Sequence, residues 1–169
     1  MAKARGKKLN AIDLLKKDHR EVEALFKEFE QLHEDGGEAA AQVIETACTE
    51  LKIHDKIETE IFYPAVRQEA EKEETELLDE AEVEHNSVRQ LIQTIEKMDP
   101  TDEKRHAHFT VLMEYVKHHV KEEEKKMFPK VKKLKGLDLG EIGGRMKERK
   151  AELMSEMGME VMEEAEESA

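Results

Sequence analysis

Apolar residues recur at intervals of three and four along four stretches of the chain, which is the spacing of one face of an α-helix. In the first stretch, Asn10 is expected to cap a helix together with Asp13, and the pair Gly36 and Gly37 is expected to end it. The second stretch is expected to stop at Pro64, because proline has no backbone N–H to continue a helix. The predicted inward positions of these two helices are Ile12, Leu15, His19, Val22, Phe26, Phe29 and His33, followed by Ala40, Ile44, Ala47, Leu51, His54, Glu58 and Ile61.

The third stretch halts before Pro100, and Asp99 is expected to cap a fourth helix that has Pro100 at its first position and ends at Pro129. Four helices with short connections predict an all-α protein, an antiparallel up-down four-helix bundle over residues 10–130. The predicted inward positions of the third and fourth helices are Leu78, Ala81, His85, Val88, Ile92, Ile95 and Met98, followed by His108, Leu112, Tyr115, His119, Glu123 and Met127.

The segments outside the bundle differ in composition. Residues 1–9 are a basic extension, and residues 131–169 are expected to hold a glycine-containing linker, a short helix over 145–157 and an acidic tail. Methionines gather in this last segment, where thioethers could bind copper but are expected to fill packing gaps instead. They are Met146, Met154, Met157, Met159 and Met162.

Composition narrows the class of protein. The 169 residues suit one domain, and 41% charged with only 4% aromatic residues disfavours a sheet-rich fold. The net charge of -13 repels phosphate, so nucleic acid is not an expected partner. Apolar runs stay far below the roughly 20 residues of a membrane span, and the start lacks a signal peptide, so a cytoplasmic protein is expected. Cys48, the only cysteine, is expected to be a buried small hydrophobic residue.

Six of the predicted inward positions carry ionisable side chains. Burying such groups without partners costs several kcal/mol each, so their presence needs an explanation. Their depths along antiparallel helices place them in one layer of the bundle, where they can meet. They are His19, His54, Glu58, His85, His119 and Glu123.

An internal repeat relates these positions. Residues 54–64, HDKIETEIFYP, match residues 119–129, HVKEEEKKMFP, in the histidine, the glutamate four positions later and the proline ten positions later. His19 aligns with His85 in the same way, so each half of the chain supplies two histidines and one glutamate. A site for two metal ions is the expected product of this duplication.

The donor set indicates which metal the site would take. Structural zinc prefers four ligands rich in thiolate, and calcium or magnesium prefers oxygen, whereas mixed imidazole and carboxylate ligands favour iron, with manganese as the alternative. If both glutamates bridge two octahedral ions with an oxo or hydroxo group, about one position on each ion stays open. A small oxidant such as dioxygen, peroxide or nitric oxide is the expected partner there.

Over about residues 10–130, the chain resembles the hemerythrin-like, or HHE cation-binding, domains. The likeness rests on the segments DLLKKDHREV, ELKIHDKIETEIFYP, EAEVEHNSV and HHVKEEEKKMFP. The resemblance implies a non-haem di-iron centre inside a four-helix bundle, held at matching positions by His19, His54, Glu58, His85, His119 and Glu123.

The chain departs from the oxygen-carrying members of that family. They place a second histidine four residues from the first on the third helix, whereas Ala81 and Arg89 flank His85 here. Reversible oxygen transport is therefore not expected. Tyr115, and with less reason Glu50, lie one turn before His119 and His54 and are candidates for an added ligand.

The other polar residues near these positions are expected to have ordinary roles. Asp18, Asp55 and Glu84 adjoin ligand histidines but are expected to be exposed more often than to support them. The histidines expected to stay outside the metal layer are His33, His106, His108 and His118.

Two classes of function remain open from the sequence. The first is a di-iron protein that binds or consumes a small oxidant, and the second is an iron-handling or iron- and oxygen-sensing module without turnover. A degenerate structural bundle is disfavoured because all six positions are retained. No nucleophile triad or nucleotide-binding motif is present, so an organic substrate is not expected, and the sequence leaves open whether the protein is an enzyme.

Overall fold

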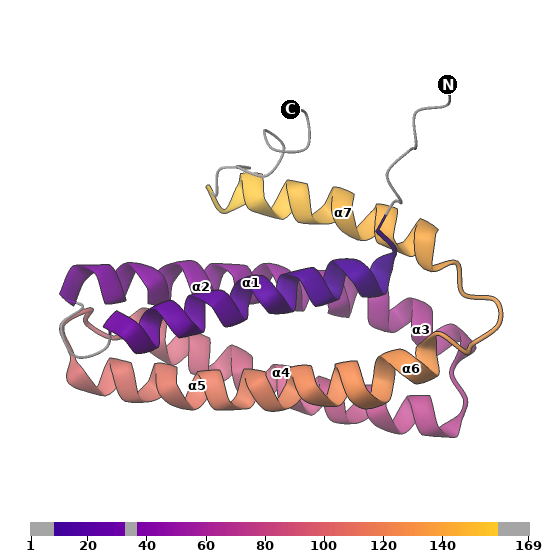
Figure 1. The fold of residues 1–169 in the computed structure, drawn as a ribbon, viewed down its shortest axis with the longest axis horizontal. Helices are drawn as coiled ribbons and strands as arrows, with labels where there is room; N and C mark the ends of the chain where they lie inside the picture. Colours follow the sequence, from indigo (N-terminus) through magenta and orange to yellow (C-terminus); the bar gives the residue numbers. More distant parts are fainter. Residues whose placement is uncertain (1–8, 33–36, 159–169) are drawn as a thin grey trace.

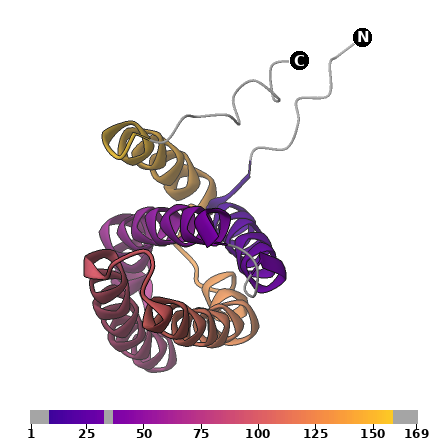
Figure 2. The same cartoon turned by 90° about the vertical axis from the view of Figure 1, so that its left-hand side faces the viewer.

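The computed structural model describes residues 9–32 and 37–158. These residues are mainly helical, and none of them forms a strand. Four long helices surround a common centre and run in alternating directions along the long axis (Figures 1 and 2). They are α1 (Ala11–Leu32), α2 (Gly37–Ile57), α4 (Lys72–Lys97) and α5 (Glu103–Glu122). The all-α prediction is confirmed. No helix of the described ranges is both long and apolar enough to cross a membrane.

Two helices do not end at their prolines. α2 continues through a π-helical segment, η1 (Glu58–Phe62), into α3 (Tyr63–Glu69), so the predicted stop at Pro64 is wrong. α5 continues in the same way through η2 (Glu123–Met127) into α6 (Phe128–Val131), just past Pro129. A proline ring clashes with the carbonyl four residues before it in a regular α-helix, and a wider turn in front of the ring accommodates it.

The start of α1 agrees with the sequence, and the start of α5 differs from it. Asn10 accepts a hydrogen bond from the backbone of Asp13 at 3.0 Å, and Asp13 accepts one from the backbone of Asn10 at 3.3 Å, as predicted. The cap of α5 is Asp102, which accepts from Lys104 N at 2.9 Å. Asp99 instead accepts hydrogen bonds from the backbone and the hydroxyl of Thr101, in the turn that precedes α5.

The inward face of α5 is also shifted from the prediction. Phe109 is fully buried and its ring lies 4.7 Å from that of Phe29, measured between centroids. Tyr115 is 48% exposed, and His108 bonds to the carbonyl oxygen of Lys104 on its own helix. Burial of the larger apolar ring of Phe109 decides the orientation of the helix.

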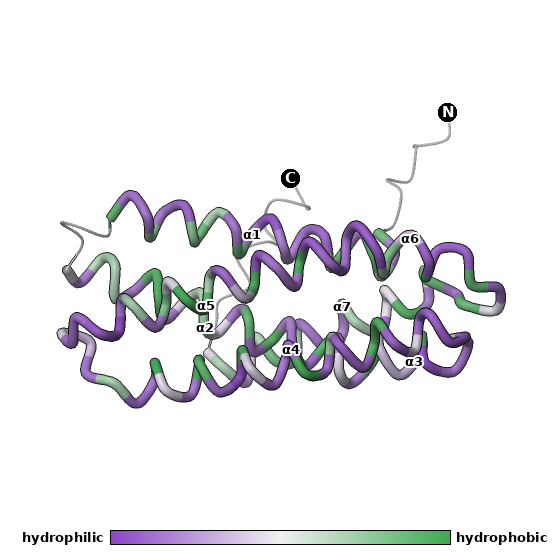
Figure 3. Tube along the Cα trace, turned by 90° about the horizontal axis from the view of Figure 1, so that it is seen from below, coloured by the Kyte–Doolittle hydropathy of each residue, from purple (hydrophilic) through white to green (hydrophobic). Residues whose placement is uncertain are grey.

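Two apolar clusters fill the bundle, one on each side of a buried polar layer. The cluster nearer the α1–α2 connection includes Phe26, Phe29 and Phe109, and the other includes Phe62 and Phe128. Along each helix, hydrophobic residues alternate with hydrophilic ones, as Figure 3 shows. Cys48 belongs to the first cluster and is buried, as predicted.

A further helix, α7 (Leu139–Glu156), lies outside the bundle against α1 and α2 (Figure 1). It begins before the predicted residue 145, because Asp138 caps it by accepting from Glu141 N at 3.0 Å. Gly143 belongs to this helix, where a Cβ atom would lie 2.8 Å from Ala11 N. Met146 is buried, and Met154 and Met157 pack against the same apolar cluster, as expected of packing residues, whereas Met159 and Met162 lie outside the described residues.

Candidate metal centre

The structure gathers all six ionisable side chains into one buried layer. Each is at most 8% exposed, and Glu58 is fully buried. Their imidazole nitrogens and carboxylate oxygens form two groups, within each of which the atoms lie less than 4.8 Å apart. The first group is His19, His54 and Glu123, and the second is Glu58, His85 and His119.

Each glutamate contacts a histidine of both groups. Glu58 Oε1 lies 3.5 Å from Nε2 of His85 in its own group and 2.6 Å from Nε2 of His54 in the other. Glu123 Oε1 lies 3.4 Å from Nε2 of His19 in its own group and 2.9 Å from Nε2 of His119 in the other. The two carboxylates therefore stand between the two groups, where a bridging ligand would stand.

Both glutamates begin π-helical turns. The backbone N–H of Tyr63 bonds to the carbonyl oxygen of Glu58, and that of Phe128 bonds to the carbonyl oxygen of Glu123, each five residues on. Such turns change the direction of the side chains on them and are frequent at functional sites. The internal repeat of the sequence is thus a repeat of this local backbone.

On the outer side of the centre, a carboxylate accepts a hydrogen bond from Nδ1 of each of its four histidines. The acceptor is Asp18 for His54 at 3.0 Å, Asp55 for His85 at 2.6 Å, Glu84 for His119 at 3.1 Å and Glu124 for His19 at 3.0 Å. Each carboxylate adjoins one residue of the centre and bonds to a histidine on the next helix, so the four contacts form a closed ring. Asp18, Asp55 and Glu84 thus support ligand histidines, contrary to the expectation; Asp18 is buried, and Asp55 and Glu84 are half-buried.

Cationic side chains balance three of these carboxylates. Arg89 donates to both oxygens of Asp55 at 2.8 Å, Lys150 lies 2.7 Å from Asp18 Oδ1, and Arg20 pairs with Glu124. Burial alone would raise the pKa of Asp18 and Asp55, but the neighbouring imidazole and cation lower each pKa to about 2. Both carboxylates are therefore charged at neutral pH.

These contacts fix which atoms face the centre. A carboxylate only accepts, so each Nδ1 donates a proton, and an imidazole in its neutral form then turns the lone pair of Nε2 inward. Buried atoms without a hydrogen bond include Nε2 of His19 and His54, both oxygens of Glu58 and Oε1 of Glu123. Lone pairs converging at such short distances repel one another unless a cation lies among them, so the residues fit a metal ion.

Without a metal, protons would have to supply that positive charge. Burial lowers the pKa of His54, but Glu58 and Asp18 raise it well above the ordinary value. Burial likewise opposes protonation of His119, yet Glu123 and Glu84 raise its pKa to about 10. The centre therefore has a strong electrostatic preference for cations.

Tyr63 is a residue of the centre that the sequence did not reveal. Its hydroxyl lies 3.0 Å from His85 Nε2 and donates to Glu123 Oε2 at 3.1 Å. The equivalent residue of the repeat is Phe128, whose ring stacks on His19 at 6.0 Å between centroids. The repeat shows an aromatic residue before the proline in both halves. The hydroxyl that only Tyr63 carries was the one feature of the sequence that could have indicated its role.

The other candidates lie away from the two groups. Tyr115, a candidate for an added ligand, is 48% exposed and does not face the centre, so its predicted inward position is wrong. Glu50 is half-buried and belongs to neither group, and Arg89 bonds to Asp55 instead of facing the centre.

The remaining histidines do not belong to the centre. His106, His108 and His118 lie outside both groups, and His33 lies outside the described residues.

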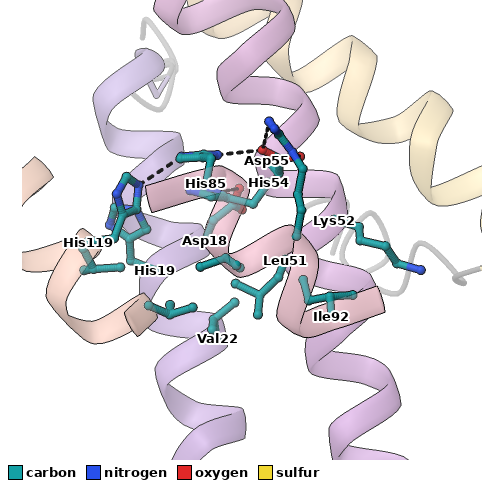
Figure 4. A pocket seen from close by; sticks show the side chains of 14 residues that line it. Asp18, His19, Val22, Leu51, Lys52, His54, Asp55, His85, Ile92 and His119 are labelled. Carbon is teal, nitrogen blue, oxygen red and sulfur yellow. Dashed lines mark hydrogen bonds and ion pairs between the residues drawn. The ribbon is translucent and has the colours of Figure 1, made fainter. Parts of the chain in front are cut away.

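A cavity of about 50 Å³ adjoins the four imidazoles (Figure 4). Its other walls are mainly aliphatic side chains of α1, α2, α4 and α5, and Figure 4 shows Val22, Leu51 and Ile92 among them. About 10–15 Å³ of such volume holds one water molecule, so the cavity accommodates a molecule of a few atoms.

Comparison with known proteins agrees with this geometry. The model of the Hemerythrin HHE cation binding domain family matches residues 10–131. The crystal structure of a hemerythrin HHE cation-binding domain-containing protein from Mycobacterium kansasii superposes with a TM-score of 0.71 and 24% identity, over 88% of this chain and 89% of that one. At this identity the likeness supports the fold alone. No curated protein matches the chain.

Proposed function

The chain belongs to the hemerythrin HHE cation-binding domain family, and from that premise we propose that it holds two iron ions in its buried polar layer. One ion would bind His19, His54 and Glu123, and the other His85, His119 and Glu58. The observation that carries the proposal is the position of the two carboxylates, each of which contacts a histidine of both groups.

The donor chemistry supports iron. Four imidazoles and two carboxylates without a thiolate suit a metal of intermediate softness, with manganese as the alternative. Every imidazole has its outer nitrogen bonded to a carboxylate, which orients the ring and raises its basicity. Tyr63 brings a further oxygen to the second group, where the sequence lacks another histidine beside His85.

We propose that the centre binds or reacts with a small oxidant such as dioxygen, peroxide or nitric oxide. Bound iron would supply one-electron redox chemistry and open coordination positions. Besides the imidazoles, the walls of the cavity are mainly aliphatic, and its volume of about 50 Å³ suits a ligand of a few atoms. The hydroxyl of Tyr63 holds a proton against Glu123 Oε2, within reach of a group in the centre.

The cytoplasmic location stays a prediction. For the function, an iron-handling or sensing role is the alternative at the same site. The two functions differ in what happens to the iron after reaction. We expect the reduced, iron-loaded protein to oxidise in oxygen and to consume added peroxide while it keeps its iron. Absorption spectra, oxygen release and iron content measured together test this expectation, because iron loss coupled to oxidation supports handling or sensing, and reversible oxygenation supports transport.

A further inference from the structure

α7 begins after the residues that match the family and reaches the outer side of the centre. Lys150 Nζ lies 2.7 Å from Asp18 Oδ1, and the other oxygen of Asp18 accepts from His54 Nδ1 at 3.0 Å. Asp18 is only 8% exposed, so the lysine joins a nearly buried carboxylate. A chain of two contacts therefore connects α7 to one histidine of the first group.

Other contacts fix the position of α7 without Lys150. Gly143 packs directly against the backbone of Asn10 and Ala11 at the start of α1. Arg149 donates to Glu60 Oε2 of η1 at 2.8 Å, and Met146 and Leu153 are buried. Because these contacts set the register of the helix, the ammonium group of Lys150 is held beside Asp18 by the fold itself.

The two halves of the repeat differ at this point. Glu84 is the equivalent of Asp18 and accepts from His119 Nδ1, and the imidazole next to it belongs to His118 on α5. The cations beside Asp55 and Glu124 are Arg89 and Arg20, which belong to bundle helices α4 and α1. Lys150 thus comes from outside the bundle and acts on the group that contains His54.

We propose that α7 controls how firmly one of the two metal positions holds its ion, the position of His19, His54 and Glu123, through the contact of Lys150 with Asp18. The inference rests on the proposed function, since it concerns metal bound at that site. Lys150 is a positioning residue. It neutralises Asp18 and keeps one oxygen directed at His54, so that Nε2 of His54 stays directed inward. At the position that includes His119, the equivalent carboxylate Glu84 lies 3.5 Å from the imidazole of His118 on α5 instead.

The test measures iron extraction by an excess of a strong chelator from the intact, fully loaded protein. In Lys150→Met the stem keeps its length but loses its charge, and we expect about half of the iron to leave on the order of tenfold faster than from wild type. The remaining half should leave at the wild-type rate. Lys150→Arg keeps the charge and should restore the slow loss, and the visible absorption spectrum should change in Lys150→Met alone.

Two variants on the same helix separate this contact from the docking of α7. Arg145 is exposed, so Arg145→Ala removes a charge without touching Asp18 and should behave as wild type. Arg149→Ala removes the contact with Glu60 and should lower thermal stability without faster iron loss. Equal acceleration of both halves of the iron, equal effects of Arg149→Ala and Lys150→Met, or a wild-type rate in Lys150→Met would each overturn the inference. A wild type that takes up no iron would overturn the proposed function as well, which distinguishes the two failures.

Discussion

Replacing Tyr63 with phenylalanine removes one hydroxyl from the centre and leaves the ring. The repeat supports retention of the fold, because Phe128 already occupies the equivalent position. In the metal-free protein, burial together with Glu123 and Glu58 raises the pKa of Tyr63 well above the ordinary value, so the phenol is protonated and donates. The variant therefore loses a buried hydrogen bond to a charged acceptor.

The magnitude follows from the contacts. A hydrogen bond to a charged group contributes about 1.5–3 kcal/mol, and leaving Glu123 Oε2 without its donor costs an amount within that range. For a protein of this size, each kcal/mol shifts the melting temperature by about 2–4 °C, so the metal-free variant should melt roughly 3–12 °C lower. In the iron-loaded protein the visible spectrum should also change, because the oxygen beside His85 is missing.

Calorimetry on the metal-free protein and absorption spectroscopy on the loaded protein measure these two effects. The matched control is Tyr115→Phe, which removes the same atom from an exposed side chain and should change neither. Identical melting temperatures and spectra for Tyr63→Phe and wild type would refute the assignment of Tyr63 to the centre. An altered spectrum in Tyr115→Phe would refute the placement of that residue on the surface.

Two further predictions concern the metal and the thiol. Removing iron with a chelator should lower the melting temperature, because the inward lone pairs of the six side chains lose their cation, and equal melting curves with and without iron would contradict this. Cys48 is buried and its pKa is raised to about 12 by burial and by Glu96, so a thiol reagent at neutral pH should label it only after unfolding. Rapid labelling of the native protein, followed by mass spectrometry, would show that the thiol is accessible.

Periodicity was sufficient to predict the helices and the layer of six ionisable residues, because burial of one face repeats every three to four positions. It failed at Pro64, where a π-helical turn carries the helix onward to Glu69. The backbone after that turn directs Tyr63 inward, so the sequence analysis considered Tyr115 and Glu50 but not Tyr63.

The hydrogen-bond partners of the carboxylates around the centre also could not be predicted from the sequence. Asp55 adjoins His54 but bonds to His85, and Glu84 adjoins His85 but bonds to His119. These partners lie on other helices, so their contacts depend on the rotation and separation of packed helices. The same limit applies to Lys150, whose distance from Asp18 depends on how α7 packs against α1.

The central claim is that the buried layer holds two iron ions. The most direct test is the iron-to-protein ratio of reconstituted protein after removal of unbound metal, measured by elemental analysis. We predict about two iron atoms per chain in wild type and in His106→Ala, and a lower ratio in His54→Ala and His119→Ala. A folded wild-type protein with no iron, with one ion per chain, or with the same ratio in all four proteins would contradict the account.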